Sequence, residues 1–383
     1  MQRLTVFAVL AAAFAVLTSA AATAEDKAPA RTSSKIQLAI LLDTSGSMDG
    51  LINQTRTQLW RIVNELATAK RDGKTPNLEV ALYEYGKASI PKSEGYLRQI
   101  LALTDDLDDI SEKLFALKTN GGSEHCGQVI QAATEGLKWS PSDRDLKLIF
   151  IAGNEPFTQG SVDYKNACAA AVKKGITVNT IYCGPKSQGV RTGWRDGALR
   201  ADGSFTSINQ NRQVAVIRTP FDARLAKLSG NINKTYVAYG RSDERKRRLN
   251  RQVAQDKAAK NAAPAAAAAR AAFKGKAAYK TSAWDLIDAL KKGKLKLKDV
   301  KTQHLPKEMQ KMSLAEKKAY IAKKTAEREK IRAEIKKLSK RRQTFITEAR
   351  KKSAASKTDA LDDAIIKTIR TQASKKKFRF EKK

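Results

Sequence analysis

The chain of 383 residues has only two histidines, three cysteines and 6% aromatic residues. It contains no Walker phosphate loop, HExxH zinc motif, G-x-S-x-G nucleophile elbow or C-x-x-C pair. Enzyme classes that these motifs identify are therefore excluded, and we expect no enzymatic activity. After residue 24 no apolar run reaches the ~20 residues that a membrane-spanning helix needs.

The first residues have the pattern of a secretory signal. Arg3 precedes an apolar run over Leu4–Leu17, and Ala22-Thr23-Ala24 forms a cleavage site of the A-x-A type. We therefore expect a signal peptide over 1–24, a linker over 25–35, and an exported protein that is periplasmic or secreted and has no transmembrane segment once the signal is cleaved. An uncleaved N-terminal anchor is the alternative.

Export has a consequence for the three cysteines, Cys126, Cys168 and Cys183, because an oxidising compartment allows a disulfide to persist. Three cysteines form at most one internal bridge. Cys168 falls in a predicted helix and Cys183 at the end of the next strand, so this pair is the first expectation. Three buried free thiols remain the alternative.

The net charge of +34 is concentrated in the second half of the chain. Residues 25–240 carry 28 basic and 23 acidic side chains, whereas residues 241–383 carry 44 basic and 16 acidic ones, a net of +28. The hydrophobic content of 42% excludes a wholly disordered chain. The sequence thus joins a nearly neutral first half to a strongly cationic second half.

Residues 36–240 alternate short apolar runs with helical periodicity, which is typical of a parallel sheet covered by helices. This pattern predicts a doubly wound, mostly parallel α/β sheet flanked by helices, with binding sites at the carboxyl ends of the strands. The expected strands are Ile36–Leu42, Leu78–Tyr85, Leu146–Ala152, Ile176–Tyr182 and Thr235–Ala238. The expected helices are one that carries Leu59 to Leu66, then Thr104–Leu117, Gly127–Leu137, Val162–Lys174 and Phe221–Leu228.

The most specific signal is Asp43-Thr44-Ser45-Gly46-Ser47, directly after the first predicted strand. A carboxylate and two hydroxyls at alternate positions can point into one site, and hard oxygen donors of this kind suit Mg²⁺. The alternative is a turn in which Asp43 and Ser45 merely cap the next helix.

With this motif, residues 36–240 resemble the von Willebrand factor type A domain, a Rossmann-like fold. Asp43, Ser45 and Ser47 match the first segment of that family's metal-ion-dependent adhesion site (MIDAS). The resemblance implies a bound Mg²⁺, or another divalent cation such as Mn²⁺ or Ca²⁺.

The resemblance also implies two further metal-binding segments. Asn120-Gly121-Gly122-Ser123-Glu124 offers Ser123 where the family has Thr, with Glu124 as an additional oxygen donor. After the strand that ends at Ala152, Asn154 falls where the family usually has Asp, with Glu155 beside it. An amide removes one negative charge, so metal affinity is expected to be weaker unless Glu124 or Glu155 restores the charge.

The family's mode of action implies an open coordination position on the cation, filled by a carboxylate of a protein partner. An enzymatic alternative would use His125 and Cys126, but neighbours in sequence do not face each other on a helix. Trp194 is either a ligand-facing aromatic or a residue that packs a long loop onto the domain.

The cationic half is expected to be a helical, partly disordered basic tail, with an Ala/Lys/Arg-rich linker over 241–280 and a basic helical region over 281–383. Ser313-Leu-Ala-Glu316 is a capping box, and an apolar stripe follows it, so 313–352 forms a coiled coil or a long helix packed on a neighbour. On an exported protein such a tail is expected to dock on anionic envelope surfaces or polysaccharide, and not on nucleic acid. The alternative function is a polyanion-binding structural protein with a degenerate metal site.

Overall fold

The computed structural model describes residues 34–383 except 209–216, 263, 353–356 and 381–383. The expected signal peptide over 1–24 and nearly all of the linker over 25–35 lie outside the described residues. Among the described helices, none combines the length and the apolar character needed to cross a bilayer.

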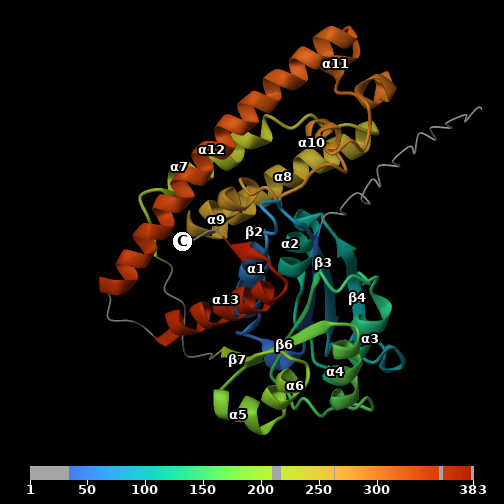
Figure 1. The fold of residues 1–383 in the computed structure, drawn as a ribbon, viewed down its shortest axis with the longest axis vertical. Coiled ribbons are helices and arrows are strands. Elements are labelled where there is room, and N and C mark those ends of the chain that lie inside the picture. Colours follow the sequence, from blue (N-terminus) through green and yellow to red (C-terminus); the bar gives the residue numbers. More distant parts are fainter. Residues whose placement is uncertain (1–33, 209–216, 263, 353–356, 381–383) are drawn as a thin grey trace, which may run out of the picture. The chain divides into compact units, whose positions relative to one another are not determined.

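The first half folds around a six-stranded sheet of order β4-β3-β1-β5-β6-β7 (Figure 1). Every neighbouring pair is parallel except β3 and β4, which are antiparallel. The expected mostly parallel, Rossmann-like α/β fold is therefore confirmed. The strands are β1 (Lys35–Asp43), β3 (Asn77–Tyr85), β4 (Leu97–Thr104), β5 (Leu146–Gly153), β6 (Ile176–Cys183) and β7 (Phe205–Ile208).

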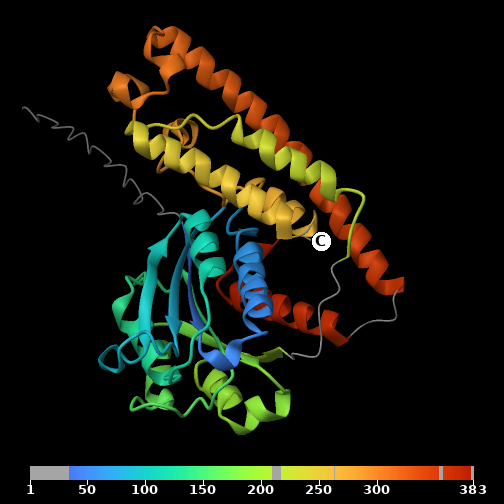
Figure 2. The same cartoon turned by 180° about the vertical axis from the view of Figure 1, so that it is seen from behind.

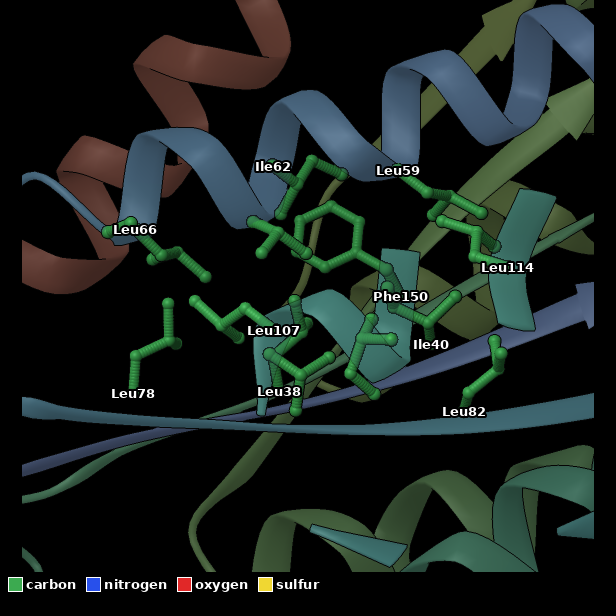
Figure 3. Close-up of a cluster of buried hydrophobic side chains, with 14 of the residues drawn as sticks. Leu38, Ile40, Leu59, Ile62, Leu66, Leu78, Leu82, Leu107, Leu114 and Phe150 are labelled. Atoms are coloured by element: carbon green, nitrogen blue, oxygen red, sulfur yellow. The ribbon is translucent and has the colours of Figure 1, made fainter. Parts of the chain in front are cut away.

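Both faces of the sheet are covered, which explains why β1 is almost uniformly apolar. Leu38 and Ile40 face one core, which contains side chains of α1 and α2 (Figure 3), and Ala39 and Leu41 face the other, with α3 and α4. The covering helices are α1 (Ile52–Leu66), α2 (Leu107–Ala116), α3 (Cys126–Gly136), α4 (Tyr164–Lys173), α5 (Lys186–Arg191) and α6 (Trp194–Arg200).

Two expected elements were assigned wrongly. The helix expected over Thr104–Leu117 begins only at Leu107, after the N-cap Asp106, because Thr104 ends the edge strand β4. The last strand of the sheet is β7, and not Thr235–Ala238, which makes only an isolated bridge between Ala238 and Asp285. Both errors concern sheet edges, where half-buried strands give a weaker apolar signal.

Residues 241–280 form packed helices where a linker was expected. The alanine-rich stretch is mostly helix α9, whose small side chains Ala267, Ala268 and Ala271 are buried between its neighbours. Alanine is the strongest helix former. Its small side chain also lets neighbouring helices approach closely, so the alanine-rich stretch is a packed helix and not a linker. The remaining helices of the chain are α7 (Asp222–Asn233), α8 (Ser242–Ala262), α9 (Pro264–Lys274), α10 (Leu286–Lys291), α11 (Lys307–Gln310), α12 (Leu314–Lys352) and α13 (Lys357–Lys375).

The long helix α12 begins at the expected capping box. Ser313 N donates to Glu316 Oε2 at 2.7 Å, and Glu316 N donates to Ser313 Oγ at 3.3 Å. Its apolar stripe, which includes Ile335, packs against α7 and α9 of the same chain (Figures 1 and 2). Arg342, which interrupts the stripe, donates to Asp222 at 2.8 Å. The apolar stripe therefore packs within the same chain, as expected for the alternative of a long helix packed on a neighbour.

The end of the chain returns to the sheet domain (Figure 2). Ile365, Ile366 and Ile369 of α13 enter the same core as α1. The short strand β8 (Arg379–Phe380) pairs antiparallel with β2 (Ala69–Lys70). The C-terminal region is therefore not a free tail, because its last helix covers part of the sheet domain's core.

The expected disulfide between Cys168 and Cys183 is not present: all three cysteines are free and buried. Cys183 lies in the core that contains α1, whereas Cys168 lies in the core on the opposite face of the sheet. The sheet separates the two sulfurs, so the alternative of three buried thiols applies.

Candidate metal centre

The expected metal-binding segments meet at the carboxyl ends of neighbouring strands. Asp43 is the last residue of β1, and Asn154 directly follows β5, whose Ala152 pairs with Leu42. The segment with Ser123 lies against the β1 loop, because Asn120 N donates to Thr44 O at 2.9 Å. Topology thus gathers three segments that lie far apart in sequence at one edge of the sheet.

Asp43 is the most deeply buried residue of this group, with no exposed surface. Its Oδ1 accepts from Ser45 N at 2.8 Å, whereas its buried Oδ2 has no partner at hydrogen-bonding geometry among the described residues. Burial raises the pKa of Asp43 to about 7 and the nearby Glu124 carboxyl adds to this rise, while hydrogen bonding with Ser45 and with the Asn154 backbone opposes it. A buried carboxylate that is only partly compensated is costly for the fold, and a cation beside it would remove that cost.

Two glycines create the space around this carboxylate. A Cβ at Gly153 would lie 2.9 Å from Asp43 Oδ2 and 2.5 Å from Tyr85 Oη. Gly86 has a φ of +76°, and a Cβ there would lie 2.8 Å from both Asp43 Oδ1 and the Glu124 Cγ. A side chain at Gly86 would displace both acidic groups, and one at Gly153 would displace Asp43 and Tyr85.

The side chains of Ser45, Ser47 and Asn154 are joined by hydrogen bonds that extend from Asp43 toward the surface. Ser45 Oγ and Ser47 Oγ are 2.9 Å apart, and Ser47 Oγ donates to Asn154 Oδ1 at 2.9 Å. Asn154 Nδ2 donates to Ser47 O at 3.0 Å. Ser45 is buried and Ser47 is exposed, so the set reaches from the core to solvent. An aspartate at 154 could not make the amide donation that ties the β5 loop to the β1 loop.

Glu124 is buried beside Asp43, although it was only an additional expectation from the sequence. Burial raises the pKa of Glu124 to about 7, and the like charge of Glu155 adds to this, while a hydrogen bond with the Ser45 side chain opposes it. The Glu124 backbone N–H donates to Gln159 Oε1 at 3.2 Å. Gln159 holds this segment in place, but no motif marks it in the sequence.

Ser123 is half-buried in the loop before α3, and Glu155 is half-buried after Asn154. The backbone oxygen of Glu155 accepts from Trp194 Nε1 at 2.7 Å. Trp194 itself is fully buried against Phe157, with ring centroids 4.8 Å apart. Trp194 therefore packs the loop onto the domain and is not a ligand-facing aromatic.

These residues fit a hard divalent cation by their chemistry. The candidate donors are oxygens of two carboxylates, two or three hydroxyls and one amide, which are the donor types that Mg²⁺ and Ca²⁺ prefer. Among the described residues no cluster of three or more His, Cys, Asp or Glu side chains is arranged to hold a metal. The candidate centre instead combines a pair of acidic residues with neutral oxygens, and Asp43 Oδ2 is the unpartnered group that a cation would satisfy.

His125 and Cys126, the alternative catalytic pair, have separate partners. His125 Nδ1 lies 3.2 Å from Gln128 Oε1, and Cys126 Sγ lies 3.8 Å from Tyr85 Oη. Burial raises the pKa of Cys126 well above its usual value, which keeps the thiol protonated at neutral pH. The geometry does not support an activated nucleophile at this position.

Residues 37–194 match the von Willebrand factor type A domain family, less than half of the chain. No curated protein matches the chain.

Solved structures that are similar to part of the chain include three proteins, each at a low TM-score. The protein BatB from Bacteroides thetaiotaomicron is 15% identical, with a TM-score of 0.36 over 45% of this chain and 90% of BatB. An aerotolerance-related membrane protein from Bacteroides fragilis is 17% identical, with a TM-score of 0.33 over 46% of this chain and 93% of that one. Proximal thread matrix protein 1 from the mussel byssus, with a zinc-occupied MIDAS motif, is 13% identical, with a TM-score of 0.35 over 47% and 43%.

Proposed function

We propose that this protein is an exported, non-enzymatic binding protein whose A-type domain uses a divalent cation to bind a carboxylate of a protein partner. Asp43, Ser45, Ser47, Ser123 and Asn154 would hold the cation, with Glu124 and Glu155 as further candidate donors. Mg²⁺ is the first candidate, and Mn²⁺ or Ca²⁺ the alternatives. The bound ion would act as a Lewis acid that offers a coordination position to the partner's carboxylate.

The observation that carries this proposal is the unpartnered Oδ2 of buried Asp43 at the carboxyl end of β1. Buried polar atoms in native proteins nearly always have a partner, and an ion is one explanation for an exception. The neutral hydroxyls and the Asn154 amide add donors without adding charge. Few negative charges around a cation leave it more able to attract a carboxylate from outside.

Isothermal titration calorimetry, with Mg²⁺ or Mn²⁺ titrated into the purified protein, tests the site. Asp43→Ala should abolish binding. Asp49→Ala is the matched control, because Asp49 is an exposed carboxylate on the same loop whose hydrogen bond comes from Thr119. Equal affinities in the wild type and in Asp43→Ala would refute the cation site.

The open coordination position has its own test. Bound Mn²⁺ that keeps an exchangeable water enhances the relaxation of water protons, and acetate, as a minimal carboxylate, should reduce this enhancement. No enhancement with bound Mn²⁺ would mean a closed, structural site, which contradicts carboxylate recognition.

The helical second half is proposed to dock the protein on an anionic envelope surface. The net charge of +28 over residues 241–383 supports this, although the structure pairs many of its arginines internally. The alternative, a polyanion-binding structural protein with a degenerate metal site, predicts partners that are lost with salt but not with chelator. The leading proposal predicts partners that are lost with chelator.

A further inference from the structure

Eight lysines and only two acidic residues occur over residues 291–312, between α10 and α12. Lys291 lies 3.6 Å from Glu329, and Lys292 lies 3.4 Å from Asp105. The other six are exposed and form no ion pair with any described residue. We call these six the lysine surface: Lys294, Lys296, Lys298, Lys301, Lys307 and Lys311.

In residues 294–298 lysines alternate with leucines, and this alternation determines which side chains face solvent. In Lys294-Leu295-Lys296-Leu297-Lys298, the two leucines pack against a buried cluster and the three lysines are exposed. The cluster contains Leu286, Ile287, Leu305 and Met309, and residues from the first turns of α12 join it. The two leucines anchor the segment to this cluster, so the alternating lysines are left on its outer side.

Several cationic groups of residues 241–383 are already paired inside the fold. Arg328, Arg270 and Lys274 are almost fully buried in ion pairs with aspartates. Arg248 and Arg251 pair with the acidic start of α2. The charge that remains available to a partner is therefore carried by exposed lysines, on the lysine surface and also along α12, where Lys330 and Lys340 are exposed.

An exposed apolar side chain follows these lysines in the sequence. Leu314, the first residue of α12, is 45% exposed and follows Lys311 by three residues. Exposed lysines beside an exposed leucine are typical of surfaces that bind a bilayer interface, where headgroups attract the charge and acyl chains accept the apolar group. A polysaccharide or nucleic acid would not require the leucine.

We infer that the lysine surface, together with Leu314, is the contact of this protein with an anionic phospholipid bilayer. This inference deepens the docking half of the proposed function and is independent of the cation site. Clusters of four to eight lysines are the size that recognises anionic lipid, and each lysine near the surface strengthens binding by about five-fold.

Co-sedimentation of the full chain with vesicles tests the inference, in chelator so that the cation site plays no part. The vesicles are phosphatidylcholine with about one-third phosphatidylglycerol, in about 0.1 M salt. Lys294→Ala/Lys296→Ala/Lys298→Ala should weaken binding roughly 10- to 100-fold. The matched control Lys330→Ala/Lys337→Ala/Lys340→Ala removes the same charge from the exposed face of α12 and should change binding less than about 3-fold.

Leu314→Ser should weaken binding a further few-fold, because burial of a leucine in the interface is lost. Circular dichroism of each variant verifies that it is folded. Equal losses in the two lysine triples would overturn the inference but leave docking by net charge intact. Failure of the wild type to bind anionic vesicles would overturn both. Binding that is insensitive to Leu314→Ser and equally strong to a soluble polyanion would point to polysaccharide and contradict the bilayer.

Discussion

Arg328 of α12 and Asp285, the N-cap of α10, form a buried bidentate ion pair. Arg328 Nη1 donates to Asp285 Oδ2 at 2.6 Å, and Nη2 donates to Oδ1 at 3.0 Å. Their exposed fractions are 1% and 0%. Arg328 also donates to Thr235 Oγ1 at 3.0 Å, and Asp285 Oδ1 accepts from Val237 N at 2.8 Å. The ion pair thus joins the long helix to the start of α10, and the hydrogen bonds of its two partners tie both to the segment that follows α7.

Loss of this pair should destabilise the protein strongly. Arg328→Ala leaves the Asp285 carboxylate buried without its cation, which typically costs about 3–5 kcal/mol. Urea unfolding followed by circular dichroism measures the change. Arg200→Ala is the matched control, because Arg200 forms an exposed ion pair with Asp196 and its removal should not change the midpoint measurably. Similar midpoints for both variants would contradict a buried, structural pair.

The amide at position 154 should limit cation affinity. Asn154→Asp adds a negative charge beside Ser47 and removes the hydrogen bond from Nδ2 to Ser47 O, worth about 1 kcal/mol. The electrostatic gain should exceed this loss, so Mg²⁺ affinity should rise roughly tenfold by calorimetry. An unchanged or weaker affinity would show that residue 154 does not face the cation.

Glu124 should provide part of the charge that Asn154 lacks. Glu124→Gln keeps the shape of the side chain but removes its charge beside Asp43, and Mg²⁺ affinity should fall roughly tenfold. Glu155→Gln tests the other candidate donor, on the neighbouring loop, and its effect should be smaller, less than about threefold. A larger effect from Glu155 than from Glu124 would reverse the assignment of the second carboxylate.

The metal-free protein should become less stable as the pH rises from about 5 to 7. Burial raises the folded-state pKa of Asp43 from 3.8 to about 7, so across this window the folded protein holds a proton that the unfolded chain has released. Stability is therefore greatest at the acidic end, and the dependence levels off above the folded pKa. Melting temperatures in chelator measure this dependence. Asp43→Asn should make the profile shallower without flattening it, because burial also raises the pKa of Glu124 to about 7. A wild-type profile no steeper than that of the variant would contradict the raised pKa of Asp43.

The last helix should stabilise the sheet domain. Ile369 of α13 is fully buried in the core that it shares with α1, so Ile369→Ala should cost about 2–5 kcal/mol. Lys367→Ala, an exposed position on the same helix, is the control for helix propensity. Thermal unfolding compares the two. If Ile369→Ala unfolds at the wild-type temperature, α13 does not contribute to that core.

The sequence determined the features that depend on neighbours along the chain. Apolar runs identified most strands of the sheet, since both faces of a covered sheet need apolar residues. The motif from Asp43 to Ser47 followed the first strand, and the capping box at Ser313 marked the start of α12, because both are local patterns. The net positive charge of the second half could likewise be counted directly from the sequence.

Only the tertiary structure decided which distant groups meet. The family resemblance suggested Glu124 as a further donor, but its burial beside Asp43 depends on how the loop before α3 packs against the end of β1, which no spacing in the sequence specifies. The sheet separates Cys168 from Cys183, although they are close in sequence. Arg370 donates to Glu65 at 2.7 Å across most of the chain. Which cations stay exposed, the lysine surface among them, could be seen only once such long-range pairs were known, because pairing is a property of packed side chains and not of composition.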